Sequence, residues 1–112
     1  KIMALIKNVE HANAFQMESL VDYESGKVVS LTLAQEKMVS MTVFAFDAGE
    51  KISTHAAPGD AMVTILDGEA EITIGDGVHL VKKGETIIMP TGVPHGLRAN
   101  ARFKMLLTVV KM

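Results

Sequence analysis

The chain contains no cysteine among its 112 residues. This absence excludes a disulfide framework, a thiolate zinc site and a cysteine nucleophile. The chain also lacks tryptophan and has a single tyrosine, Tyr23, which argues against an aromatic platform for stacking nucleic-acid bases. It has no secretory apolar region and no long apolar run, so we expect a cytoplasmic location and no membrane partner.

The charged residues show no excess of one sign. The formal net charge is −2, and basic residues such as Lys82 and Lys83 are interleaved with acidic ones such as Asp76 and Glu85. Such a mixture is typical of a solvated surface rather than of an electrostatic footprint for phosphates. We therefore expect no nucleic-acid partner.

From residue 27 onward the sequence reads as short strands. Runs rich in Val, Ile, Leu and Thr cover residues 28–33, 39–46, 61–66, 69–74, 78–81, 86–89 and 103–110. Turn signals lie between several of them, among them Asp67-Gly68, Gly75-Asp76-Gly77 and Lys83-Gly84, because glycine adopts positive φ at little cost. Many short strands without a long helical pattern predict an all-β fold, a sandwich or a barrel.

The first 26 residues lack this regularity. Residues 8–11 could form one short helical turn capped by Asn8, and Phe15, Met17 and Leu20 are expected to anchor the segment to the strands. A length of 112 residues matches one domain of common size. We expect a single domain over residues 1–112, with the barrel at about 27–110 and an irregular segment at 1–26.

Two stretches share a regular spacing of glycine, proline and histidine. The positions that carry this spacing are Gly49, His55, Gly68, Gly84, Pro90, Gly92 and His95. Each glycine or proline occurs at an arbitrary position only about 5–7 % of the time, so chance does not explain the register. The register resembles the cupin superfamily, whose two signatures are G-x5-H-x-H-x(3,4)-E-x6-G and G-x5-P-x-G-x2-H-x3-N.

The resemblance implies a single-domain, antiparallel, jelly-roll-like β-barrel with a pocket inside. Side chains alternate between the faces of a strand, so His55 and His95 are expected to meet in that pocket. Three signature positions hold alanine instead, namely Ala57, Ala61 and Ala99. In the family the first two supply a histidine and a glutamate to a divalent metal. Ala57 and Ala61 should therefore make the pocket roomier and more apolar.

The remaining ligands could hold only a weakly bound divalent transition metal, Zn, Ni, Cu, Fe or Mn, on His55 and His95 with waters. Asp60 precedes the usual glutamate position by one residue, and a bulge at Pro58-Gly59 could turn it inward to complete a two-His-one-carboxylate set. In a regular strand it would face solvent instead. Equally, the two histidines could bind only each other or water.

The other residues that could be metal ligands are expected to have structural roles or to lie at the surface. His79 lies among aliphatic residues and is expected to pack, whereas His11 is expected to be exposed. Met62, Met89 and Met105 are expected in the core rather than as copper ligands.

Three functions remain open, because cupins include enzymes, storage proteins and sensors, and a fold alone selects none of them. The first is a small-molecule-binding protein in which His55 and His95 supply polar recognition. The second is a weakly metal-dependent isomerase, lyase or dioxygenase using the same two residues, and the third is a noncatalytic dimeric module. The resemblance also implies a homodimer, for which the strand at 39–46 together with Leu5, Phe15 and Met17 is a candidate surface.

Overall fold

A computed structural model describes residues 4–112, which form eight β-strands and one short 3-10 helix. The elements are η1 (Met17–Leu20), β1 (Val28–Gln35), β2 (Val39–Phe46), β3 (Lys51–His55), β4 (Gly59–Ile74), β5 (Gly77–Lys82), β6 (Thr86–Met89), β7 (His95–Arg98) and β8 (Phe103–Lys111). All strand pairs are antiparallel, so the all-β prediction is confirmed. No helix in the described range has the length and apolar character needed to cross a membrane.

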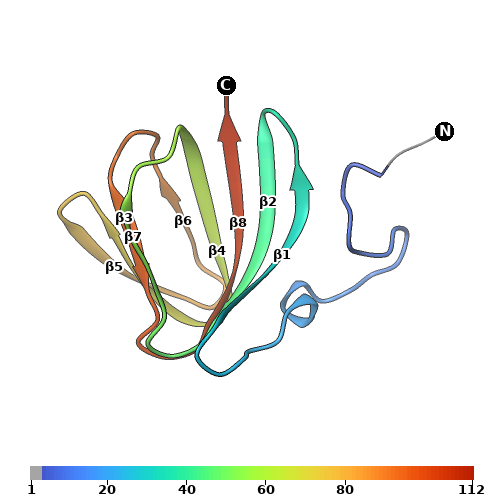
Figure 1. Cartoon of the computed structure of the whole chain (residues 1–112), viewed down its shortest axis with the longest axis horizontal. Coiled ribbons are helices and arrows are strands. Elements are labelled where there is room, and N and C mark those ends of the chain that lie inside the picture. The colour runs from blue at the N-terminus through green and yellow to red at the C-terminus, as the bar shows by residue number, and fades with distance from the viewer. Residues whose placement is uncertain (1–3) are drawn as a thin grey trace.

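The long strand β4 joins two layers into a curled barrel (Figure 1). Its first part, residues 59–68, pairs with β8, and within it residues 61–64 also pair with β6. Its last part, residues 69–74, pairs with β5 and residues 71–74 with β7. One layer therefore runs β1-β2-β8-β4-β6 and the other β5-β4-β7-β3, which is the jelly-roll-like arrangement that the glycine and histidine register predicts.

The predicted turn at Asp67-Gly68 is wrong, because both residues lie inside β4. The register against β8 shifts between Ile65 and Asp67, and Gly68 has a φ of 73°. A Cβ at Gly68 would clash with the backbone oxygen of Arg102. The glycine thus provides a bend at which β4 passes from one layer to the other, and the strand continues because both halves find partners. The other signature glycines, at 49, 84 and 92, do lie between strands.

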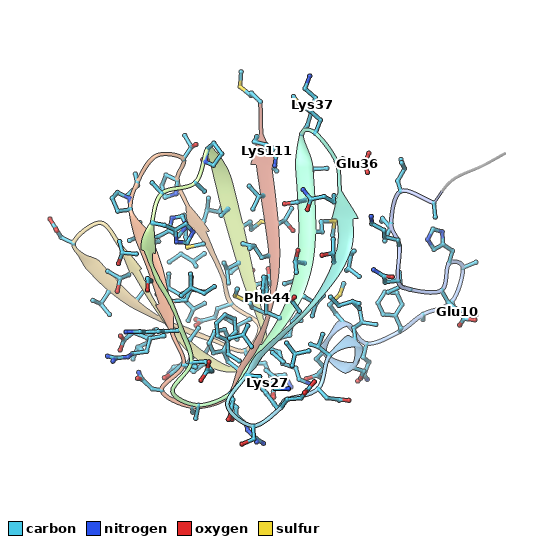
Figure 2. The ribbon with its side chains drawn as sticks, in the orientation of Figure 1. Glu10, Lys27, Glu36, Lys37, Phe44 and Lys111 are labelled. Carbon is cyan, nitrogen blue, oxygen red and sulfur yellow. The ribbon has the colours of Figure 1, made fainter. Side chains whose placement is uncertain are left out.

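The main hydrophobic core fills the space between the two layers. Phe46 and Phe103 are both 0% exposed and stack with ring centroids 4.6 Å apart. The Phe44 side chain also points inside the curve of the sheets (Figure 2). A second buried cluster lies on the outer face of the larger layer, where Val43 and Ala45 pack beneath the N-terminal segment. Side chains on both faces of β2 are therefore buried or half-buried.

The N-terminal segment runs along the edge strand β1 (Figure 1). Residues 8–11 form no helical turn, and the expectation of one is wrong, since Asn8 has a left-handed φ of 67°. Its side-chain amide instead donates to the carbonyl oxygen of Thr32 at 2.6 Å. Met17 and Leu20 pack against the second cluster as predicted, whereas Phe15 remains 48% exposed.

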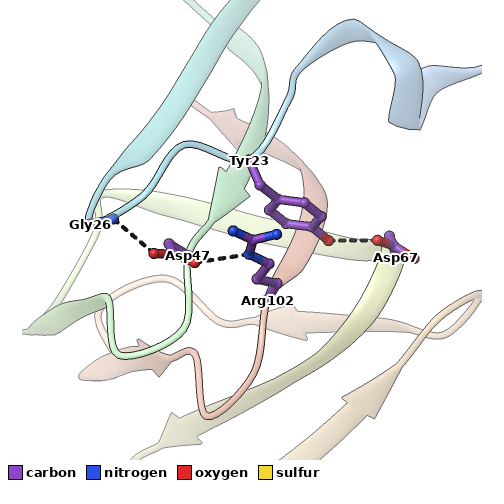
Figure 3. A network of polar contacts seen from close by, with 5 residues as sticks. All are labelled: Tyr23, Gly26, Asp47, Asp67 and Arg102. Atoms are coloured by element: carbon purple, nitrogen blue, oxygen red, sulfur yellow. Dashed lines mark hydrogen bonds and ion pairs between the residues drawn. The ribbon is translucent and has the colours of Figure 1, made fainter.

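A polar network ties this segment to the barrel near the start of β8 (Figure 3). The Tyr23 hydroxyl donates to Asp67 Oδ2 at 2.6 Å. The Arg102 guanidinium and the Lys104 ammonium lie 5.2 Å and 5.0 Å from the centroid of the Tyr23 ring. At such distances a cation is attracted to the π face of the ring. Lys104 also donates to the backbone oxygen of Glu18 at 2.8 Å. Burial, followed by the hydrogen bond to Asp67, raises the pKa of Tyr23.

Asp47 completes the network from the end of β2. Its Oδ2 accepts from the backbone N–H of Gly26 at 2.7 Å, and its Oδ1 accepts from Arg102 Nε at 3.0 Å. The Gly26 hydrogen bond, followed by the one from Arg102, lowers the pKa of the Asp47 carboxyl. These contacts fix the point at which the chain enters β1.

Candidate functional site

His55 and His95 form the centre of the candidate site. His55 ends β3, His95 begins β7, and the two residues are direct partners in the antiparallel ladder. Their ring centroids are 4.5 Å apart, and the rings meet edge to face at 66°. His95 is only 2% exposed, whereas His55 is exposed to solvent. His55 therefore lies at the mouth of the site and His95 inside it.

Local backbone features bring the two rings together. The register between β3 and β7 shifts between Ile52 and His55, which adjusts the direction of the His55 side chain. Gly96 follows His95, and a Cβ at that position would lie 3.2 Å from the backbone oxygen of Ile52 and 3.3 Å from Thr54 Oγ1. The missing side chain thus allows β7 to approach β3 closely.

The hydrogen bonds of the two rings determine which ring nitrogen remains available to a ligand. His55 Nδ1 lies 3.0 Å from the backbone oxygen of Ser53, and His95 Nδ1 lies 3.2 Å from that of Val93. A carbonyl oxygen only accepts, so each Nδ1 carries the hydrogen. Each neutral ring then keeps a free lone pair on Nε2. Within residues 4–112 neither Nε2 has a hydrogen-bond partner.

The two imidazoles line a cavity of about 90 Å³ inside the barrel. Besides them its lining is apolar and consists of Ile52, Ala57, Ala61, Met89, Leu97, Met105, Leu107 and Val109. The four residues that the sequence placed in one pocket, His55, Ala57, Ala61 and His95, thus share one cavity. The cavity is small, and it suits a compact ligand.

Asp60 does not face this cavity. It is exposed between the buried residues Gly59 and Ala61, as regular strand alternation requires. Its Oδ1 accepts from the backbone N–H of Thr91 at 2.9 Å. The inward bulge that the sequence left open is therefore absent. The described part of the chain contains no group of three or more His, Cys, Asp or Glu residues placed to hold a metal.

Asp60 instead helps to close the rim of the cavity. The backbone oxygen of Ala57 accepts from the Gly92 N–H at 3.1 Å and from Thr91 Oγ1 at 3.3 Å. Together with the contact between Asp60 and Thr91, these bonds fasten the connection after β3 to the connection after β6. The sequence contained no signal for this role beyond the polar side chains themselves.

The other residues singled out from the sequence lie elsewhere. His79 is exposed on β5, so the expectation that it packs is wrong. His11 is exposed as expected, and its Nε2 lies 2.6 Å from the backbone oxygen of Ile6. Met89 and Met105 are buried as predicted, but Met62 is 40% exposed on the outer face of β4, so its assignment to the core is wrong. Strand alternation explains the difference, because Met62 adjoins the inward-facing Ala61.

Residues 42–110 match the family model described as the cupin domain. The chain belongs to the cupin family. A solved structure of a conserved protein of unknown function from Streptococcus pyogenes is 46% identical, with a TM-score of 0.96 over 100% of this chain and 98% of that one. A cupin superfamily protein from Desulfitobacterium hafniense is 30% identical, with a TM-score of 0.92 over 97% and 100%.

A further relative of this cupin is an uncharacterized protein from Streptomyces coelicolor, 28% identical over 73% of this chain and 79% of that protein. None of these descriptions assigns an activity. The residues present do not fit the divalent metal site that the family resemblance implies. Methyl groups occupy two of its four ligand positions, at Ala57 and Ala61, and no carboxylate lines the cavity.

Proposed function

We propose that this cupin binds a small ligand of few heavy atoms in the barrel cavity, held by Nε2 of both His55 and His95. The observation that carries the proposal is the pair of bonds from Nδ1 to the backbone oxygens of Ser53 and Val93. These bonds leave two hydrogen-bond acceptors facing one apolar cavity, and ring centroids 4.5 Å apart place both within reach of one ligand.

The chemistry of the site limits the ligand. Two neutral imidazoles with Nδ1 already bonded present acceptors and no donors, so a matching ligand offers two N–H or O–H groups. The remaining lining is apolar, and a buried anion would find no positive partner there. The predicted ligand class is therefore a compact neutral or cationic molecule with two adjacent donors.

Two probes of the same shape test this proposal. Urea carries donors on both sides of its carbonyl group, whereas acetone has a similar outline and no donor. We expect urea to shift the ¹⁵N resonances of Nε2 in His55 and His95 saturably in long-range ¹H–¹⁵N spectra, with His79 as an internal control. Acetone should not shift these resonances. If the two probes act alike, or if only His79 responds, the proposal fails.

Mass spectrometry supplies an independent check. The protein is purified without chelator and then denatured, and any molecule that it releases is identified by its mass. A molecule with two adjacent donors and few heavy atoms would support the assignment, and one too large for a cavity of about 90 Å³ would contradict it.

A further inference from the structure

A second concave surface lies on the outside of the smaller layer. It is an open groove of about 360 Å³ over β3, β4 and β7. Gly96 belongs to its lining, whereas the preceding residue, His95, lines the barrel cavity. Successive positions of a strand point to opposite faces, so the groove and the cavity lie on opposite sides of the same strands. Six polar or charged residues line the groove: Lys51, Ser53, Thr54, Glu71, Thr73 and Arg98.

Two cations lie next to each other in this groove. Lys51 on β3 and Arg98 on β7 are direct partners in the antiparallel ladder, and both are exposed. Like charges directly opposite each other destabilise a sheet. Within residues 4–112 neither side chain forms an ion pair. The fold thus maintains two adjacent positive charges that an anion would neutralise.

Hydroxyl groups surround the centre of the groove, where Gly96 has no side chain. Thr73 on β4 is the direct ladder partner of Gly96. On the β3 side, a Cβ at Gly96 would lie 3.3 Å from Thr54 Oγ1, so this hydroxyl borders the same point. Ser53 precedes Thr54 and is exposed. A ligand in the groove therefore meets groups that both donate and accept hydrogen bonds.

The charges of the groove select the anionic group of the ligand. A phosphate monoester carries about −1.5 to −2 charges at neutral pH, which matches two cations, whereas a carboxylate carries one charge. The Arg98 guanidinium suits phosphate because it can bind two of its oxygens at once. Glu71 lies opposite Arg98 on β4, and its Oε1 accepts from Asn100 Nδ2 at 3.1 Å. Its Oε2 can therefore accept from a ligand hydroxyl, and its charge would repel a second anionic group.

We propose that this groove binds a small polyol phosphate, with the phosphate group on Lys51 and Arg98 and the hydroxyls on Thr54, Thr73 and Glu71. This inference goes beyond the proposed function and does not rest on it, because the lining of the barrel cavity contains no lysine or arginine to hold a phosphate. The ligand of the cavity and the ligand of the groove occupy opposite faces of the sheet. Either proposal can fail without the other.

NMR of the full chain with glycerol 3-phosphate as the probe tests the location and the ligand class. At neutral pH the probe should shift the amide resonances of residues 51–54, 71–73 and 96–98 saturably, and the Nε2 resonances of His55 and His95 should not move. Glycerol, which has no charge, should cause no shifts. Inorganic phosphate and glycerate should bind more weakly than the probe. Equal affinity for either would overturn the assignment of a polyol phosphate, and shifts outside the groove would overturn the site.

Two double variants that remove the same charge test the role of the cations. Lys51→Gln/Arg98→Gln should weaken binding of glycerol 3-phosphate about tenfold or more, through the loss of at least one charge-assisted hydrogen bond. The control, Lys37→Gln/Lys83→Gln, changes two exposed lysines in connections outside the groove and should bind like the wild type. Equal losses in the two variants would reduce the binding to attraction by net charge and overturn the site.

The stability of the first variant without ligand separates a binding role from a structural one. Removing the repulsion between Lys51 and Arg98 should leave the urea midpoint of Lys51→Gln/Arg98→Gln at or above that of the wild type. Its weaker binding would then not be a consequence of unfolding. A clearly lower midpoint would show that the two cations serve the fold rather than a ligand, and would overturn the proposal.

Discussion

His55 and His95 face each other across β3 and β7, each with Nδ1 bonded to the backbone oxygen of the residue two positions earlier in the chain. This repeated local bond, and not only the closeness of the rings, defines the site. It sets the same tautomer in both residues and leaves Nε2 of each ring with a free lone pair. The chemistry of the cavity follows from this relationship.

Acid should abolish ligand binding at the pair. A proton on either ring occupies Nε2, because Nδ1 already carries a hydrogen, and this removes one of the two acceptors. It also adds a charge in a cavity that has no carboxylate. We expect urea affinity, measured by NMR, to fall as the pH is lowered. Binding that strengthens on acidification would show that the acceptors are not the recognition groups.

Asp60→Ala should loosen the rim without affecting metal affinity. The substitution removes the acceptor of the Thr91 N–H, so hydrogen exchange at that amide should accelerate while the core strands keep their protection. Zinc affinity, measured by calorimetry, should equal that of the wild type, because Asp60 lies outside the cavity. Asp60→Asn, which retains a side-chain oxygen, serves as the control. A loss of zinc affinity in Asp60→Ala would reinstate Asp60 as a ligand.

The fold was predictable because its strongest signals are local. Gly49, Gly84 and Gly92 mark connections between strands, and the apolar runs mark most of the strands themselves. The Asp67-Gly68 signal failed for a nonlocal reason. A glycine with positive φ serves a hairpin turn or a bend inside a strand equally well, and only the partners on both sides of β4 decide between them. The strands β3 and β7 are short and partly polar, so composition did not reveal them.

The site was predictable in part. Strand alternation and the histidine register brought His55, His95, Ala57 and Ala61 to one cavity. They could not show that Met89 shares it, since neighbours within a cavity depend on how β6 aligns with β4. The tautomers and the rim contact of Asp60 depend on single hydrogen bonds, whose geometry no residue pattern encodes.

Tyr23→Phe should destabilise the protein at neutral pH. It should also weaken the decrease in stability that the wild type shows at high pH. Hydrogen bonds to charged groups contribute about 1.5–3 kcal/mol. Because Tyr23 is only partly buried, we expect a decrease at the lower end of this range, about 1.5–2 kcal/mol, in the free energy of unfolding. The fold raises the pKa of Tyr23 above its ordinary value near 10, so the neutral phenol is favoured in the folded state. Its contribution is full below about pH 10 and declines as the pH rises above that value. Urea denaturation at several pH values should show this decline in the wild type and a weaker one in the variant.

Dimerisation remains a prediction, with a revised surface. In the strand at 39–46, residues such as Val43 and Ala45 are 0% exposed within one chain and cannot supply the contact. Ile88 at 55% and Val110 at 58% exposure lie on the outer face of the larger layer. We expect light scattering to give twice the chain mass of 12.1 kDa and Ile88→Lys/Val110→Lys to give the monomer mass. Val78→Lys, on β5 in the other layer, is the control and should remain dimeric.

Restoring the missing family ligands should create a strong divalent site. Ala57 and Ala61 line the cavity with both histidines, so Ala57→His/Ala61→Glu adds a third imidazole and a carboxylate beside them. The wild type, with two neutral ligands, should hold zinc or nickel weakly and release it to chelator without unfolding, because its core is independent of metal. Four ligands including one charge should raise the affinity by orders of magnitude.

Calorimetry or competition binding with zinc and nickel measures this gain, and a shifted pair of substitutions controls for it. Ala56→His/Met62→Glu introduces the same two side chains one position away on the exposed side, since both residues are exposed next to the lining positions. Because both positions are exposed and neither belongs to the cavity lining, the shifted variant should bind metal no better than the wild type. Equal affinities for the two double variants would mean that positions 57 and 61 do not direct their side chains at the histidines. The register of the first motif would then be wrong, and with it the comparison to the four-ligand family site.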